Sequence, residues 1–256
     1  MAVPADPFAW SWHPEAVGAA ALLAVAYAAA VRGRPVQRWR PAAFAAGIAL
    51  LVATAVTPLD ALSYHLLSAH LLQNVILAEW APLLLVAGLP PSLAARVGRL
   101  PLVRTLVHPL VGLPLWAGTY FAWHLPPAYD TALEHALLLH AEHASYLVAG
   151  CLLWWPVLHD EPRSLAWGSR AAYVLIAFLS ASPVGLLLAL LPDPIYGWYE
   201  DGFARWDVSP LADQQAAGLI MSASETLVFF AVFAYAFFRF LAEEERRGDA
   251  ASAGPA

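Results

Sequence analysis

Residues 134–143, EHALLLHAEH, concentrate side chains that can bind metal ions. This stretch holds three histidines and two glutamates, whereas residues 146–155, YLVAGCLLWW, carry no charge. Neutral imidazole is a common ligand of copper, zinc, iron and nickel. The pattern therefore favours metal binding at the polar mouth of an apolar segment.

Three other stretches place polar or metal-competent side chains beside apolar residues. In HLLSAHLLQN, residues 65–74, the side chains of His70, Gln73 and Asn74 share one helical face through their i, i+3, i+4 spacing. His124 follows an apolar run in the sequence WHLPP. The stretch LADQQAAGLIM contributes Asp213, Gln214 and Met221. Metal ligands are thus available from four separate segments.

The composition indicates that these segments belong to a membrane protein. Hydrophobic residues make up 61% of the 256-residue chain and charged residues only 12%, against about 25% charged in ordinary soluble domains. The mean hydropathy is +0.61. One soluble core of this size could not bury so much apolar surface. The lipid bilayer is the expected partner, and no nucleic-acid partner is expected.

Apolar runs of spanning length predict seven transmembrane helices, because about 20 helical residues cross a bilayer core. Only helices or closed barrels satisfy the backbone there, and runs this long indicate helices. The runs cover approximately residues 15–31, 41–57, 66–88, 107–123, 137–158, 170–191 and 212–238. The expected fold is an all-α, seven-helix bundle forming one domain over residues 1–242. Residues 243–256 are expected to be a disordered cytoplasmic tail.

The arginines predict the direction of the bundle. Twelve of the thirteen fall in connections on one side of the seven runs, and Arg205 alone falls on the other. The positive-inside rule makes the arginine-rich side cytoplasmic, with the N-terminus outside and the C-terminus inside. Seven of the nine histidines then lie at the outer side. These are His13, His65, His70, His124, His135, His140 and His143.

The histidines of the fifth run can be placed on one helix. Thr131 and Glu134 form a capping-box pattern, which predicts a helix of about 28 residues beginning at Thr131. On that helix His135, His140 and His143 lie within an arc of about 140°. The expected metal ligands are His70, His140 and His143, with His124, His135 and Met221 as further candidates. The expected supporting polar residues are Gln73, Asn74, Glu142, Asp213 and Gln214.

Two further acids, Glu79 and Glu225, fall deep within the third and seventh runs. Carboxylates within a bilayer usually face the bundle interior or water. We therefore expect Glu79 and Glu225 to be protonated or hydrogen-bonded, with each other as possible partners. For each single histidine the simpler reading is a solvated or hydrogen-bonded interfacial residue, and for Met221 it is packing.

Three blocks of the sequence resemble the bacterial CtaG family of multispanning cytochrome c oxidase assembly factors. They are residues 65–91, residues 123–158 with the pattern WHLP…H…EH…WWP, and residues 208–221, VSPLADQQAAGLIM. The resemblance implies a non-catalytic, multi-pass protein of the bacterial inner membrane. It also implies a role in the assembly of a haem–copper oxidase, with the oxidase subunits as partners and copper as the metal supplied.

The same resemblance implies which residues serve in oxidase assembly. At two positions this chain differs from the family pattern. His70, His124, His140 and His143 match the family's histidines, and His135 matches less closely. The last block matches at Asp213, Gln214 and Met221. The family commonly has a second histidine where this chain has Asn74, so a histidine pair on the third run is lost. Glu79 occupies a place expected to be apolar.

Three functions remain open from the sequence. An assembly factor would hold Cu(I) at the outer face and transfer it by ligand exchange, and a soft methionine would favour Cu(I). A noncovalent haem-binding redox protein could use two histidines on facing helices as axial ligands. A metal or proton transporter would need a polar path, for which Glu79 and Glu225 are the deep charges. An enzyme is the least expected reading.

Overall fold

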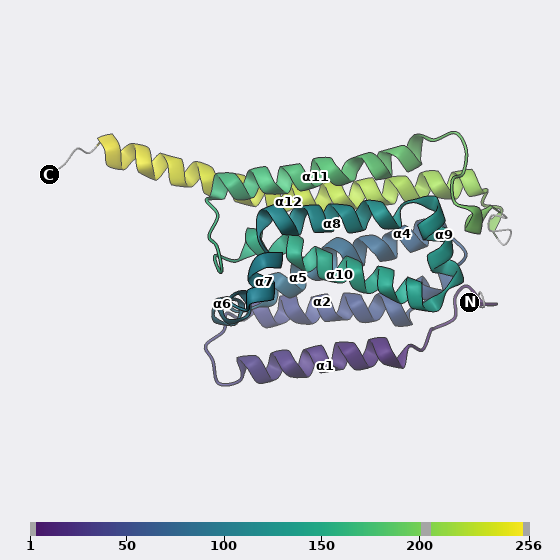
Figure 1. Ribbon diagram of the computed structural model, residues 1–256, viewed down its shortest axis with the longest axis horizontal. Coiled ribbons are helices and arrows are strands. Elements are labelled where there is room, and N and C mark those ends of the chain that lie inside the picture. Colours follow the sequence, from purple (N-terminus) through teal and green to yellow (C-terminus); the bar gives the residue numbers. More distant parts are fainter. Residues whose placement is uncertain (1–3, 201–205, 253–256) are drawn as a thin grey trace.

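The computed structural model describes residues 4–200 and 206–252, and every regular element within them is a helix (Figure 1). The all-α prediction is confirmed for this part of the chain. In chain order the elements are α1 (Pro14–Val31), α2 (Trp39–Val56), α3 (Pro58–Ser63), α4 (Leu67–Val75), η1 (Ile76–Trp80), α5 (Ala81–Gly88), α6 (Pro91–Gly98), α7 (Pro101–Leu106), α8 (Pro109–Trp123), α9 (Pro126–Glu134), α10 (Ala136–Leu158), α11 (Trp167–Leu190), η2 (Gly197–Tyr199) and α12 (Pro210–Ser252).

Six of these helices are long and apolar enough to cross a membrane. They are α1, α2, the continuous helix Leu67–Gly88 formed by α4, η1 and α5, α10, α11, and α12. The fourth predicted span corresponds to α8, which has 15 residues and is therefore about 22 Å long, less than the roughly 30 Å of a bilayer core. A multi-helix membrane protein is supported, and the count of seven spans remains a prediction.

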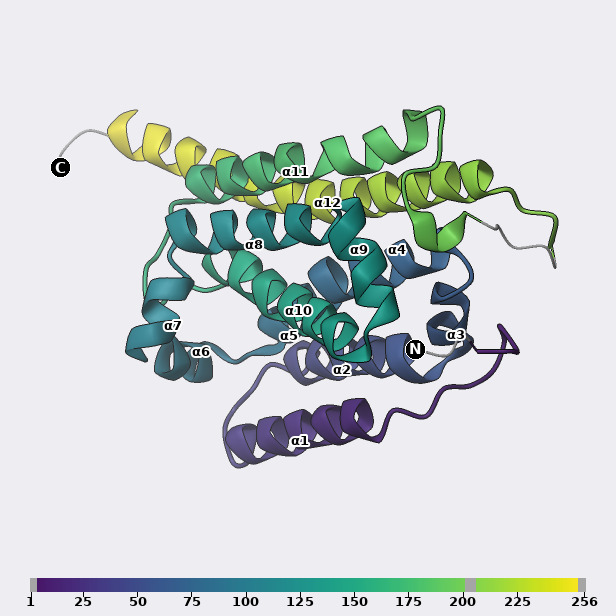
Figure 2. The same ribbon diagram turned by 45° about the vertical axis from the view of Figure 1, so that its right-hand side comes forward.

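The helix Leu67–Gly88 is the centre of the bundle. It contacts α2, α10 and α12, and 72% of its most apolar window is buried by protein. By contrast α1 lies at the edge beside α2, with 11% of its window buried (Figure 2). Polar residues on the central helix therefore face other helices, which is where a bundle can hold buried ligands.

Two local features fix how α10 sits against the central helix. A Cβ atom at Gly150 would lie 2.2 Å from the carbonyl oxygen of Ala78, so only glycine allows this close approach. On the central helix, Pro82 has no backbone N–H that could donate a hydrogen bond to the carbonyl of Ala78, four residues earlier. The chain there forms a π-turn over Ile76–Trp80, with the Ala81 N–H donating to the Ile76 carbonyl. Glu79 lies on this turn.

The predicted run at residues 137–158 corresponds to α10, but the longer helix expected to begin at Thr131 does not form. Residues 126–134 form a separate helix, α9, which begins at Pro126, and the chain breaks at His135 with φ −125° and ψ 107°. Thr131 lies inside α9, where its hydroxyl donates to the Pro127 carbonyl instead of capping α10. The single long helix was wrong because the proline pair at 126–127 starts a helix earlier. His135 therefore does not share a helix with His140 and His143.

The end of the chain also differs from the predicted disordered tail. Helix α12 continues to Ser252 and extends beyond the bundle in Figure 1. Arg247 pairs with Glu243 at 2.9 Å and with Glu244 at 2.5 Å, at the i, i+4 and i, i+3 spacings that stabilise an exposed helix. Residues 253–256 and Arg205, the arginine predicted on the outer side, lie outside the described residues.

Candidate metal centre

His70 of α4 and the adjacent Glu142 and His143 of α10 form a buried cluster. Their ligand atoms all lie within 4.8 Å of one another. The His70 and His143 ring centroids are 6.1 Å apart, and His70 Nε2 is 3.6 Å from Glu142 Oε1. The side chains of His70 and Glu142 are each 1% exposed. Water therefore contributes little to the solvation of His70 and Glu142, whereas His143 is half-buried.

The hydrogen bonds around His70 assign its tautomer. The Tyr199 hydroxyl donates its single proton to the Ser63 carbonyl at 2.5 Å. Its oxygen must then accept from His70 Nδ1–H, which lies 3.3 Å away. In a neutral His70 imidazole, Nε2 carries the lone pair, and this atom faces the Glu142 carboxylate. Two acceptors face each other in a buried site, an arrangement that needs a cation or a proton between them.

The buried cluster also contains polar atoms without hydrogen-bond partners. Among the described residues, His70 Nε2, His143 Nε2 and Glu142 Oε2 make no hydrogen bond. Buried polar atoms are nearly always satisfied in native proteins. Metal–nitrogen and metal–oxygen bonds are about 2.0–2.2 Å long, so small side-chain rotations would bring donors 4.8 Å apart onto one ion. The three donors fit a metal ion.

Asn74, the departure from the family pattern, holds the carboxylate of the buried cluster. Its Nδ2 donates to Glu142 Oε1 at 2.9 Å. Asn74 is itself buried at 3% exposure, one helical turn after His70. The amide thus orients Glu142 toward the two imidazoles, and the carboxylate takes a donor position beside the histidines.

His124 and Met221 lie next to the buried cluster but outside it. They line a small void together with Asn74 and Tyr146. His124 Nδ1 donates to the Tyr120 carbonyl at 2.7 Å, and its Nε2 is buried without a hydrogen-bond partner. Met221 is 1% exposed. Among the described histidines and acids, His124 is not part of the group within one ion's reach, and the void that Met221 lines is not bordered by His70, Glu142 or His143.

Three of the predicted supporting residues have structural contacts. Asp213 of α12 accepts hydrogen bonds from the backbone N–H groups of Leu67 at 2.6 Å and Ser68 at 3.1 Å, and so caps the start of α4. Gln214 bonds to the Ile195 N–H and the Asp193 carbonyl, which holds the loop before η2. Gln73 donates to the Thr54 carbonyl of α2. These contacts position the elements around the buried cluster.

His140 belongs to a second group, which we call the rim cluster: His13, Glu15 and His140. Its ligand atoms also lie within 4.8 Å of one another. His140 does not join His70 and His143 as the sequence predicted, because its side chain faces α1. His13 and Glu15 were missed as ligands, although an H-x-E pattern at the start of the first span marks them. His135 is exposed, with Nδ1 bonded to the Thr131 carbonyl.

Deeper in the bundle, Glu79, Glu225 and Tyr120 form a third polar group. The Tyr120 hydroxyl donates to Glu225, and the two carboxyl groups lie close enough to interact electrostatically. Both Glu79 oxygens are buried without a hydrogen-bond partner among the described residues. The sequence left open whether the two acids meet, and this interaction shows that they lie near each other. Two adjacent buried carboxylates are costly without a shared proton or cation.

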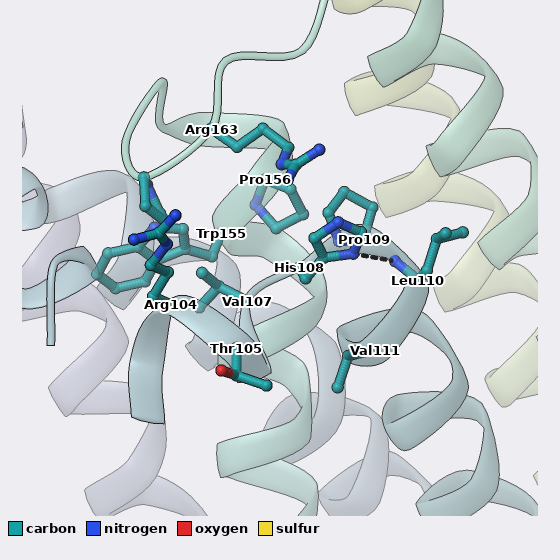
Figure 3. Close-up of a pocket in the computed structure, with 11 residues that line it drawn as sticks. Arg104, Thr105, Val107, His108, Pro109, Leu110, Val111, Trp155, Pro156 and Arg163 are labelled. Carbon is teal, nitrogen blue, oxygen red and sulfur yellow. Dashed lines mark hydrogen bonds between the residues drawn. The ribbon is translucent and has the colours of Figure 1, made fainter. Parts of the chain in front are cut away.

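The opposite end of the bundle has different chemistry. A cavity of about 470 Å³ there is bordered by Arg104, His108, Trp155 and Arg163 (Figure 3). His108 Nδ1 accepts a hydrogen bond from the Leu110 N–H at 3.2 Å. No carboxylate lines this cavity. His159, which follows α10 and lies outside the cavity lining, has a pKa that burial lowers. Both described groups with metal-ligand spacing therefore lie away from this arginine-lined end.

The family model of the cytochrome c oxidase caa3 assembly factor, Caa3_CtaG, matches residues 20–243. This chain belongs to that family. The match includes the whole buried cluster, and from the rim cluster it includes His140 but neither His13 nor Glu15. This match confirms the resemblance seen in residues 65–91, 123–158 and 208–221 to a family of cytochrome c oxidase assembly factors.

Proteins of two mycobacteria are similar to this chain over most of its length. An uncharacterised protein of Mycobacterium bovis is 25% identical over 253 residues, covering 88% of this chain and 38% of its own length. One from Mycobacterium leprae is 25% identical over 218 residues, covering 76% of this chain and 33% of its own length. The chain thus spans well under half the length of these relatives. No solved structure was found to match it.

Proposed function

We propose that this protein is a membrane-embedded assembly factor that holds a copper ion at the buried cluster and transfers it to an oxidase subunit. The observation that carries the proposal is the opposition of the His70 Nε2 lone pair and the Glu142 carboxylate, with His143 Nε2 also unpartnered. A metal ion satisfies all three groups at once. The role of the family in oxidase assembly supports copper as the cargo.

The types of the three donor atoms determine which oxidation state of copper the buried cluster prefers. Two imidazoles and one carboxylate are nitrogen and oxygen donors, and among divalent first-row ions Cu²⁺ binds such sites most tightly. Met221, the sulfur expected to favour Cu(I), lines a void with Asn74 and His124 that none of the three donors borders. We therefore propose Cu²⁺ as the preferred ion, with Zn²⁺ as its strongest competitor among common cellular metals.

We further propose that the chain crosses a bacterial inner membrane seven times, with α8 as the short fourth span. The arginine-rich connections would then be cytoplasmic, and the starts of α4 and α10 would face outward. This orientation places both histidine clusters near the outer surface, where a copper-accepting oxidase subunit could meet them. Transfer would proceed by ligand exchange, so the chain performs no catalysis.

Copper titration of the purified full chain tests this proposal. The wild type should bind copper tightly, and His70→Ala with His143→Ala should abolish the tight binding. His135→Ala is the matched control, because His135 is exposed and lies outside both clusters. Tight binding that survives the double substitution would contradict the proposal. A Soret band in protein made with haem available would instead favour the haem-binding alternative.

A further inference from the structure

The rim cluster has the geometry of an exchangeable metal site. His13 Nδ1 lies 3.2 Å from Glu15 Oε1, and His140 Nε2 lies 3.9 Å from the same oxygen. The side chains of Glu15 and His140 are 57% and 51% exposed. Because water reaches these donors, an ion can bind and leave without rearrangement of the bundle.

Asp60 of α3 orients His13 within the rim cluster. Its Oδ2 lies 3.2 Å from His13 Nε2, and Asp60 is 7% exposed. A proton on Nε2 donates to this carboxylate and leaves the Nδ1 lone pair facing Glu15 and His140. Metal-binding histidines usually donate their other ring N–H to a carboxylate or carbonyl in this way. The alternative reading is a protonated His13 between two carboxylates, which a metal titration distinguishes.

One cavity connects the rim cluster with the buried cluster. Its volume is about 460 Å³, and its walls include His13, Glu15 and His140 as well as His143. Small side chains of α1, among them Ala16 and Ala19, leave this space open. His140 and His143 are three residues apart on α10, so their Cβ atoms are roughly 5–6 Å apart. An ion leaving His140 can therefore reach His143 without passing through a helix.

We propose that the rim cluster is a second, weaker site for Cu²⁺ that loads the buried cluster through this cavity. The inference rests on the proposed function of the buried cluster. The ion keeps its oxidation state throughout, and transfer exchanges His13, Glu15 and His140 for His143, Glu142 and His70. The rim cluster selects an ion from solution, and the buried cluster retains it.

The test is a Cu²⁺ titration of the detergent-purified full chain, with loading followed in time through competition with a chromophoric chelator. The wild type should bind two copper ions, one tightly and one weakly. Glu15→Gln with His140→Ala should remove the weak site and slow loading of the tight site by about tenfold or more. Both substituted side chains are exposed, so the variant should fold, and His135→Ala serves as the matched control.

A second variant tests the orientation of His13. Asp60→Asn keeps the size of the side chain but weakens its hold on His13 Nε2–H. Loss of such an outer partner typically weakens metal binding by about 10–100-fold. The weak site should therefore lose affinity while the tight site keeps its stoichiometry. Unchanged weak-site affinity in this variant would overturn the role of His13 as a ligand.

The outcomes separate this inference from the proposed function. If the Glu15→Gln/His140→Ala variant loads at the wild-type rate with two ions, the rim cluster is not a loading site and the inference is overturned. If the His70→Ala/His143→Ala variant keeps the tight ion, the proposed function fails and the loading route fails with it. If the His70→Ala/His143→Ala variant loses the tight ion and keeps the weak one, the result supports both the proposed function and the rim cluster as a loading site.

Discussion

The buried cluster and the rim cluster contain the same residue types, two histidines and one glutamate, in opposite surroundings. In the buried cluster the His70 and Glu142 side chains are each 1% exposed, whereas in the rim cluster His140 and Glu15 are more than half exposed. Water replaces a lost partner in the rim cluster but not in the buried one. Under the proposed function, burial more than ligand identity would separate the site that retains copper from the site that exchanges it.

The largest expected difference concerns the removal of an imidazole. In the apo-protein a proton must take the place of the metal between His70 Nε2 and the Glu142 carboxylate, 3.6 Å apart. His70→Ala removes the group that shares this proton, and breaking a buried pair in this way costs about 3–5 kcal/mol. The free energy of unfolding of the apo-protein in detergent should fall by that amount. His135→Ala, at an exposed site, should change it by less than about 0.5 kcal/mol.

A double substitution checks that this loss arises from the carboxylate. Adding Glu142→Gln to His70→Ala removes the uncompensated charge, so the double variant should be more stable than His70→Ala alone. If the losses in unfolding free energy from His70→Ala and from Glu142→Gln simply add in the double variant, the two side chains do not interact. The His70–Glu142 pairing would then not cause the difference between the clusters.

The second expected effect concerns the hydrogen bond that orients Glu142. Asn74→Leu keeps a similar volume but removes the Nδ2 donor at 2.9 Å. Hydrogen bonds to charged groups contribute about 1.5–3 kcal/mol, so the free energy of unfolding should fall by that amount. Tight copper binding should weaken as well, because Glu142 is then free to rotate. Copper affinity equal to that of the wild type would show that Glu142 needs no such support.

The third effect concerns the helix that carries His70. Asp213→Ala removes the carboxylate that accepts from two backbone N–H groups at the start of α4. Loss of a helix cap costs about 0.5–2 kcal/mol, measurable as a lower midpoint of thermal unfolding. Asp193→Ala, whose side chain has no bond to α4 among the described residues, is the control. A midpoint equal to that of the wild type would argue against this capping role.

The smallest effect belongs to the rim cluster. Glu15→Gln should leave the thermal unfolding midpoint of the apo-protein unchanged, because solvent replaces the carboxylate contacts to His13 and His140. The same variant should lose the weak copper site in a titration. A clear loss of apo-protein stability would mean that the rim cluster is a structural ion pair, and the contrast with the buried cluster would then disappear.

The sequence predicted most of the helices because they depend on local patterns. The apolar run at residues 66–88 matches the helix Leu67–Gly88 closely. The sequence also grouped His70 with His143, but it placed Glu142 among the supporting residues and not among the donors. The break at His135 was not predicted, because Thr131 and Glu134 resemble a cap while the preceding proline pair starts α9.

The division of the histidines between two clusters could not be predicted from one chain's pattern. His140 and His143 lie about 60° apart on the helical wheel, and either could have faced α4. Their separation depends on how the helices pack, because His140 Nε2 lies 3.9 Å from Glu15 of α1 and the His143 ring lies 6.1 Å from the His70 ring of α4. His13 and Glu15 meet His140 across more than 120 residues of sequence, so only the packing of helices reveals the rim cluster.

X-ray absorption spectroscopy at the copper edge, on full-length protein loaded with one equivalent of Cu²⁺, tests the central claim most directly. The account predicts a first shell of nitrogen and oxygen with scattering from two imidazoles, one of which is lost in His143→Ala. A spectrum that is unchanged in His70→Ala and His143→Ala, or one that contains a sulfur ligand such as Met221, would contradict it.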